Sequence, residues 1–160
     1  MTTQPNTVRI AASAAAEELL ARILYAEAGQ RPVRAIEALA ALALNRARSV
    51  LVSDEARLRF AAGATAGSLP RALIAVLRAP FQFQVRHSRH RLHARFAQPI
   101  EGDPALAVCR RVAGRALSGA LPDMTGNAVH WHDETRQPGW ALGRMPSAEA
   151  GGLSFYRLEP

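Results

Sequence analysis

The sequence has no lysine, a single cysteine and few aromatic residues, and these shortages narrow the classes of protein it can represent. One cysteine, Cys109, excludes a disulfide framework and a cysteine-based metal site, and its apolar neighbours predict a buried, inert thiol. Because aromatic residues make up only 6% of the chain, alanine and leucine fill the predicted core positions, which favours helices.

The motifs of several enzyme classes are also missing. The sequence contains no glycine-rich phosphate loop, no GxSxG nucleophile elbow and no HExxH zinc motif, and Cys109 lacks any local sign of activation. Dehydrogenase, kinase and cysteine-protease functions therefore find no support. No segment reaches the run of about 18 apolar residues that spans a membrane. The N-terminus lacks a basic start followed by a hydrophobic stretch, so we expect no signal peptide.

The charge is one-sided, because 20 basic residues, all arginine, outweigh 13 acidic residues and give a net charge of +7. Codon bias toward arginine and attraction to a polyanion are both open explanations. Four arginines and three histidines (His87, His90 and His93) lie in the segment 86–95. We expect this segment to be a solvated basic loop. Contact with an anionic polymer is the next interpretation, and a metal bound by the three histidines is a third.

With 160 residues, 49% of them apolar, the chain suits one domain. Residues 1–12 are predicted to be a flexible N-terminal segment, and residues 13–160 to form the folded domain. Apolar spacing and turn residues predict helices at 13–28, 32–49, 70–78 and 104–118, and strands at 128–132 and 151–156. The expected fold class is therefore mainly α (α+β), with a small β portion toward the C-terminus.

Some helix ends and one loop are predicted in more detail. The first helix is expected to begin at Ser13 and to end at Gly29 in the left-handed conformation. The second helix is apolar on nearly all sides and should be the central, buried one. The glycines within residues 50–69 predict a loop there.

Glu27 is a lone carboxylate among small residues at the end of the first predicted helix. It could be an ordinary helix-end residue that pairs with Arg31 or Arg34. However, a negative charge near a helix C-terminus opposes the helix dipole, so stability alone does not select it there. Small neighbours would let another segment approach and desolvate the carboxyl, which raises its pKa and suits a general acid.

The tripeptide His130-Trp131-His132 offers a second candidate site. In a strand, the two histidines point to the same side, which suits a metal, but structural zinc requires four ligands. A sugar-binding wall, with Trp131 as its apolar face, fits better, and ordinary packing stays open.

Six elements of the chain occur in a recognisable order. They are ARILYAEA (21–28), ALALNRA (41–47), PFQFQ (80–84), ALSG (116–119) followed by Asp123, Thr125 and Ala128, PGW (138–140) and GGLSFY (151–156). Together they resemble the motifs of the SleB/CwlJ-type cell-wall hydrolases, the family of the spore-cortex-lytic enzymes. The resemblance covers almost the whole chain.

The resemblance implies a lysozyme-like fold and a lytic transglycosylase that cleaves peptidoglycan between N-acetylmuramic acid and N-acetylglucosamine. It implies that Glu27 is the catalytic acid and base, and it implies no metal or other cofactor. On this hypothesis the glycan cleft is lined by Tyr25, Asn45, Gln82, Phe83, His130, Trp131 and Tyr156. We expect a monomer that binds peptidoglycan glycan strands, is made in the cytoplasm, and reaches the cell wall after release or by assisted delivery.

A single catalytic carboxyl is compatible with this chemistry. Most glycosidases need two carboxylates that flank the bond. Here Asp133 and Glu134 fall in a turn that we expect to be unrelated to Glu27. A lytic transglycosylase tolerates this, because attack by the substrate's own muramic O6 replaces the second group.

Departures from the family pattern leave two alternatives open. Arg31 stands where the family has an acidic residue, and Leu153 stands where GGHxFY has histidine. The protein could be an amidase that cuts the lactyl-peptide bond with a metal on His130 and His132. It could also be a catalytically degenerate module that binds glycan or an anionic polymer through its arginines.

Overall fold

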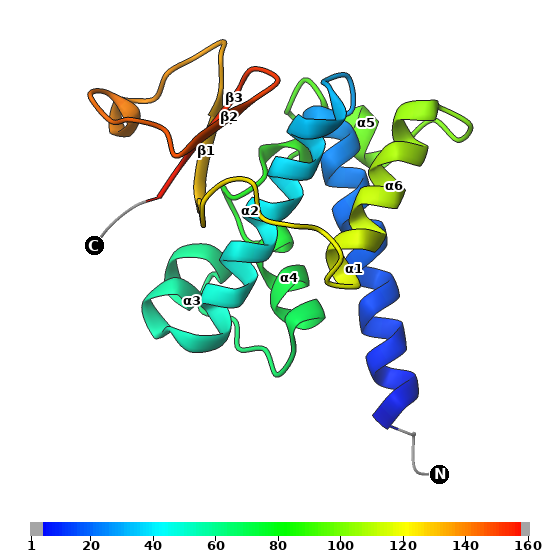
Figure 1. Cartoon of the computed structure of the whole chain (residues 1–160). Coiled ribbons are helices and arrows are strands. Elements are labelled where there is room, and N and C mark those ends of the chain that lie inside the picture. Colours follow the sequence, from blue (N-terminus) through cyan, green and yellow to red (C-terminus); the bar gives the residue numbers. More distant parts are fainter. Residues whose placement is uncertain (1–4, 158–160) are drawn as a thin grey trace.

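A computed structural model describes residues 5–157 as six α-helices, two short 3-10 helices and a three-stranded sheet (Figure 1). The helices are α1 (Pro5–Ala28), α2 (Val33–Val52), α3 (Asp54–Ala61), α4 (Leu69–Arg78), η1 (Gln84–Arg86), α5 (His93–Ala97), α6 (Pro104–Leu117) and η2 (Gly139–Ala141). The strands are β1 (His130–Asp133), β2 (Ala148–Ala150) and β3 (Leu153–Tyr156). The expected class, mainly helical with a small β portion near the C-terminus, is confirmed.

Helix α2 is the centre of the fold, as its sequence predicts. Every side chain from Ala38 to Ala47 is buried. Its neighbours are α1, α3, α4 and α6, and the sheet lies beside it on the side away from α1 (Figure 1). The many alanines let these helices approach closely, and alanine and leucine side chains make up most of the core. No helix within residues 5–157 is long and apolar enough to cross a membrane.

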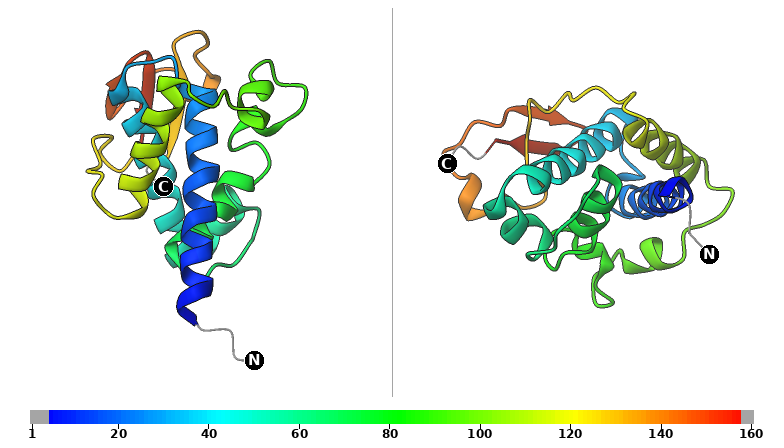
Figure 2. Two further views of the ribbon diagram at one scale, coloured as in Figure 1. Left: turned by 90° about the vertical axis from the view of Figure 1, so that its right-hand side faces the viewer. Right: turned by 90° about the horizontal axis from the view of Figure 1, so that it is seen from below.

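Helix α1 is longer than the sequence predicts. It begins at Pro5, so the expected start at Ser13 is wrong, and residues 5–12 belong to the helix. Proline is tolerated in a first helical turn, and the following alanine-rich run has high helix propensity. Figure 2 shows these first turns extending beyond the rest of the molecule. Residues 1–4 of the expected flexible segment lie outside the described residues.

Gly29 ends α1 for a different reason from the one expected. Its φ angle is not positive, so the left-handed conformation is not used there. Instead, its N–H donates to the Tyr25 carbonyl at 3.2 Å, and a Cβ at this position would come within 2.5 Å of that oxygen. Glycine is therefore required by close approach of the backbone.

The expected loop at 50–69 contains a helix, α3. Ser53 caps it, because its hydroxyl accepts from the Ala56 N–H at 3.2 Å, and two acidic residues occupy the first turn. This capping sequence could have predicted the helix, but the glycines that follow it favoured the prediction of a loop. The helix α5 and the strand β2 were also missed, because they have only five and three residues.

The sheet is antiparallel with the order β1-β3-β2. Gly151 and Gly152, with φ angles of +54° and +82°, form the two-residue turn between β2 and β3. The strands predicted at 128–132 and 151–156 are therefore confirmed in place, but each begins two residues later. The central strand β3 buries Leu153, Phe155 and Tyr156, which fixes the sheet against the helices.

Polar side chains of α2 tie the helices to the sheet. The Asn45 amide donates to the Asp123 carboxylate and to the Ala128 carbonyl, both at 3.1 Å. Arg46 Nε donates to the Val129 carbonyl at 2.7 Å. These bonds set the start of β1, and they thereby place the residues that follow on β1 opposite the helical layer.

Candidate active site

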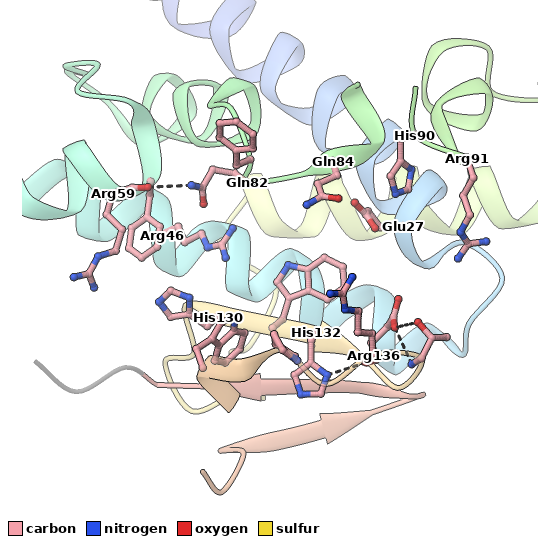
Figure 3. A pocket seen from close by; sticks show the side chains of 17 residues that line it. Glu27, Arg46, Arg59, Gln82, Gln84, His90, Arg91, His130, His132 and Arg136 are labelled. Atoms are coloured by element: carbon pink, nitrogen blue, oxygen red, sulfur yellow. Dashed lines mark hydrogen bonds between the residues drawn. The ribbon is translucent and has the colours of Figure 1, made fainter. Parts of the chain in front are cut away.

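A pocket of about 740 Å³ lies between the helical layer and the sheet (Figure 3). Its helical wall is formed by Glu27, Arg46, Arg59 and Phe60. A second wall is formed by the segment around η1 and its continuation, with Phe81, Gln82, Gln84, His90 and Arg91. The third is formed by β1 and the loop after it, with His130, Trp131, His132, Asp133, Thr135, Arg136, Pro138 and Trp140.

Glu27 lies half-buried in the last turn of α1, at one end of this pocket (Figure 3). Burial raises the pKa of its carboxyl to about 7, and nearby Asp133 adds to this effect. The Val85 backbone, Arg91 and Arg31 oppose it without cancelling it. Near neutral pH both protonation states are therefore populated, so this carboxyl can both donate and accept a proton.

The ordinary helix-end interpretation of Glu27 is not what the structure shows. Arg31 donates to the Gly151 carbonyl at 2.7 Å and pairs with Glu134 at 3.4 Å. Within residues 5–157 Glu27 has no ion-pair partner at all, neither Arg31 nor Arg34. The carboxyl is thus available to a ligand.

Asp133 lines the same pocket, so the expectation that it sits in an unrelated turn is wrong. Burial acts to raise the pKa of Asp133, but hydrogen bonds from the Thr135 hydroxyl and N–H, with Arg31 and Arg91 nearby, outweigh burial and lower it. Two carboxyls in one pocket thus have pKa values displaced in opposite directions, which is typical of an acid and its charged companion. The two residues are far apart in the sequence, and only the docking of β1 brings them together.

Aromatic rings form the wall contributed by the sheet side. The Trp140 ring meets the Tyr156 ring edge-on with centroids 5.2 Å apart, and Tyr156 stacks on His132 at 5.5 Å. Tyr156 Oη and His132 Nε2 are 3.0 Å apart. Trp140 keeps 39% of its surface exposed and can offer an apolar face to a sugar ring.

The structure brings together four of the eight residues predicted for the site. Gln82, His130 and Trp131 line the pocket with Glu27. Tyr156 lies just behind it and supports His132 and Trp140.

The other three predicted residues are structural in this arrangement. Tyr25 is 1% exposed, and its hydroxyl donates to Asp103 at 2.7 Å, away from the pocket. Asn45 holds the loop before β1, as described above. Phe83 is 3% exposed and packs beside the Arg46 guanidinium at 5.5 Å. Short motifs mark these positions in the sequence, but they do not distinguish a residue that lines the pocket from one that holds the lining residues in place.

The residues that sequence reasoning missed are chiefly the pocket's arginines and Asp133. Arg46, Arg59, Arg91 and Arg136 all line it. The local signal for Arg46 was its place beside Asn45 in an otherwise apolar helix.

The histidines do not assemble a metal site. His93 Nδ1 lies 2.8 Å from the Val85 carbonyl, and His90 Nδ1 accepts from the Leu92 N–H at 3.2 Å. Two of the three histidines at 87, 90 and 93 thus contact nearby backbone groups. His130 and His132 both line the pocket, but within residues 5–157 no three metal-ligating side chains come together. The histidine pair therefore lacks the third protein ligand that a catalytic zinc requires.

Comparisons with known proteins bear on the fold. No protein-family profile matches the chain, and no curated protein sequence matches it. The crystal structure of the catalytic domain of the Bacillus cereus SleB protein matches with a TM-score of 0.60, at 20% sequence identity, over 89% of each chain. The chain therefore has a SleB-type fold, which confirms the expected lysozyme-like α+β class.

Proposed function

We propose that the protein is a peptidoglycan glycosidase that cleaves between N-acetylmuramic acid and N-acetylglucosamine, with Glu27 as its catalytic acid and base. The observation that carries this proposal is the Glu27 carboxyl itself: it faces a pocket of about 740 Å³, and burial raises its pKa to about 7. The SleB-type fold and the exposed Trp140 support the choice of a glycan as substrate.

The preferred reaction is that of a lytic transglycosylase. Protonated Glu27 gives its proton to the glycosidic oxygen, the bond from this oxygen to muramic C1 breaks, and the N-acetylglucosamine 4-hydroxyl leaves. The Glu27 carboxylate then takes the proton of the muramic O6 hydroxyl as O6 bonds to C1. The product is a 1,6-anhydromuramic end, and Glu27 is protonated again. A carboxyl that ionises near neutral pH suits both proton transfers.

A second candidate is hydrolysis of the same bond, and the position of Asp133 favours it. Hydrolytic glycosidases place a second carboxylate near the bond, either to activate water or to stabilise charge at C1. Asp133 lines the pocket with Glu27, and the lowering of its pKa keeps it ionised. The two candidates share the acid and differ in the nucleophile, which is muramic O6 in one and water in the other.

Digestion of purified peptidoglycan, with products identified by mass spectrometry, separates these candidates. The variants are Glu27→Gln and Asp133→Asn, and Glu134→Gln is the control because its exposed carboxylate pairs with Arg31 outside the pocket lining. Anhydromuramic ends that disappear with Glu27→Gln alone support the transglycosylase. Reducing muramic ends that disappear with either pocket variant support hydrolysis.

Two other results would contradict the proposal. Free stem peptides would identify an amidase, and binding without any product in the unaltered protein would identify a non-catalytic module. Contact of the segment 86–95 with an anionic polymer, the monomeric state and the route of delivery to the cell wall stay predictions.

A further inference from the structure

The end of the pocket remote from Glu27 holds a buried cation that has no counterion among residues 5–157. Arg46 is 5% exposed, and Figure 3 shows its guanidinium directed into the pocket from α2. Its carbon Cζ lies 5.2 Å from the Phe60 ring centroid and 5.5 Å from that of Phe83, so two apolar faces hold it in place. Burial lowers the pKa of Arg46 to about 9, which still leaves it charged at neutral pH.

The hydrogen-bonding capacity of Arg46 is only partly used. Its Nε donates to the Val129 carbonyl, but its Nη1 is buried and has no hydrogen-bond partner in the described part of the chain. None of the ion pairs within residues 5–157 includes it. A buried charge that is neither paired nor fully hydrogen-bonded is costly, so the site gains from an anionic ligand.

The neighbours of Arg46 add donors and positive potential. The Nε2 atom of His130 is also buried, with no hydrogen-bond partner among the residues that the structure describes. Burial, together with Arg46, Arg59 and Arg144, lowers the pKa of His130 to about 4, so its ring is neutral at pH 7. Arg59 faces the same end of the pocket and pairs with the exposed Glu55 at 2.7 Å.

The two ends of the pocket therefore differ in charge. Glu27 lies at one end, close to both Asp133 and Arg91, whereas the other end holds the cations Arg46 and Arg59 with the neutral ring of His130 (Figure 3). A glycan strand of peptidoglycan repeats its muramic residues at regular intervals, and each of these carries a lactyl group at O3. This group ends in a free carboxylate where no stem peptide is attached, and a stem peptide brings carboxylates of its own.

We propose that the end of the pocket formed by Arg46, Arg59 and His130 is a subsite for a carboxylate of the glycan substrate. It selects muramic residues over N-acetylglucosamine and so sets the register of the strand across Glu27. The proposal rests on the proposed glycosidase function and names the chemical group that this pocket recognises.

The test measures binding to the Glu27→Gln protein by calorimetry, because this variant does not consume the ligand. The probes are a peptide-free muramic acid–N-acetylglucosamine tetrasaccharide, the same tetrasaccharide with its lactyl carboxylates converted to methylamides, and a tetrasaccharide that bears stem peptides. We expect the free carboxylate form to bind about tenfold more tightly than the methylamide, as for one charge-assisted hydrogen bond.

Additional substitutions in the Glu27→Gln background locate the effect. Arg46→Met and Arg59→Gln should reduce the preference for the carboxylate form, and Arg91→Gln, which removes the same charge at the Glu27 end, should keep it. Because Arg46→Met alters the core, nuclear magnetic resonance of the His130 ring in the Glu27→Gln protein gives a second measurement. The carboxylate ligand should raise the pKa of this ring, and the methylamide should not.

The outcomes distinguish the subsite from the function on which it rests. Tighter binding of the free carboxylate form than of the methylamide assigns the lactyl group. Tighter binding of the stem-peptide probe alone, reduced by Arg46→Met or Arg59→Gln but not by Arg91→Gln, assigns the peptide; both results support the subsite. Equal binding of all three probes, or an equal loss with Arg91→Gln, overturns the subsite and leaves the glycosidase intact. Failure of every probe to bind overturns the proposed function as well.

Discussion

Replacing Glu27 by glutamine should stabilise the folded protein, and the gain should depend on pH. The pKa of Glu27 is raised from 4.5 to about 7, mainly by burial. The folded state therefore holds a proton between these pH values that the unfolded state has lost, and stability falls as pH rises through this window. At about 1.36 kcal/mol per pKa unit, the loss is at most about 3 kcal/mol at pH 8. Glutamine does not titrate and avoids this loss.

The assay is urea unfolding of both proteins at pH 4 and at pH 8. The difference in unfolding free energy between Glu27→Gln and the unaltered protein should be greater at pH 8, by up to about 3 kcal/mol. Glu18→Gln is the matched control on the same helix, because the Glu18 side chain is 44% exposed and pairs with Arg22 at 3.0 Å. It should show no gain at pH 8, since exposed ion pairs contribute about 0–1 kcal/mol.

The reasoning would be refuted by the same stability difference at both pH values, or by a greater loss at pH 8. Either result would mean that Glu27 ionises in the folded protein as it does in the unfolded chain. The carboxyl would then be a solvated helix-end residue, and the proposed acid would have no physical basis. The measurement does not depend on any substrate.

Four further predictions follow from the same contacts. If cleavage needs protonated Glu27, activity on peptidoglycan should fall as pH rises through about 7. Asp133→Asn should move this fall to lower pH, because it removes a charge that raises the Glu27 pKa. An unchanged pH profile would contradict this electrostatic coupling between Asp133 and Glu27. Tyr25→Phe should lower the unfolding free energy by about 1–2 kcal/mol with no change in kcat, since it loses a hydrogen bond outside the pocket. Asn45→Ala should cost about 2–3 kcal/mol in urea unfolding, because it leaves the buried Ala128 carbonyl without its donor and removes the bond to Asp123; a cost near zero would show that the loop before β1 holds without it. Trp140→Ala should raise KM for glycan about tenfold and change stability little, because the residue is 39% exposed. An unchanged KM would show that Trp140 does not contact the sugar.

Secondary-structure elements that depend on nearby residues in the sequence were predicted well. The position at which α1 ends, the buried helix α2 and the helix α6 follow from apolar spacing and turn residues over a few positions. The elements α5 and β2 were missed because five and three residues give too little periodicity to recognise, and α3 was missed because the glycines after it favoured a loop. The early start at Pro5 shows that high helix propensity can extend a helix beyond its apolar stripe.

The candidate site was predicted only in part. Glu27 was identified because a carboxylate at a helix end among small residues is unfavourable for stability alone. Asn45 and Tyr25 were assigned to the cleft, but their hydrogen-bond partners lie in distant loops that the sequence does not place. A polar residue in a buried helix can face a ligand or hold a loop, and only its partner distinguishes the two.

The sequence by itself determined the mainly helical class, the central position of α2 and the candidacy of Glu27, because helix periodicity and dipole effects operate between near neighbours. Only the tertiary structure decided that Asp133 shares the pocket with Glu27 and that Arg46 lies at the other end, buried and with no ion-pair partner within residues 5–157. These relations arise where the sheet docks on the helices. Burial and the potential of distant charges set the pKa values there, and both are properties of the packed chain.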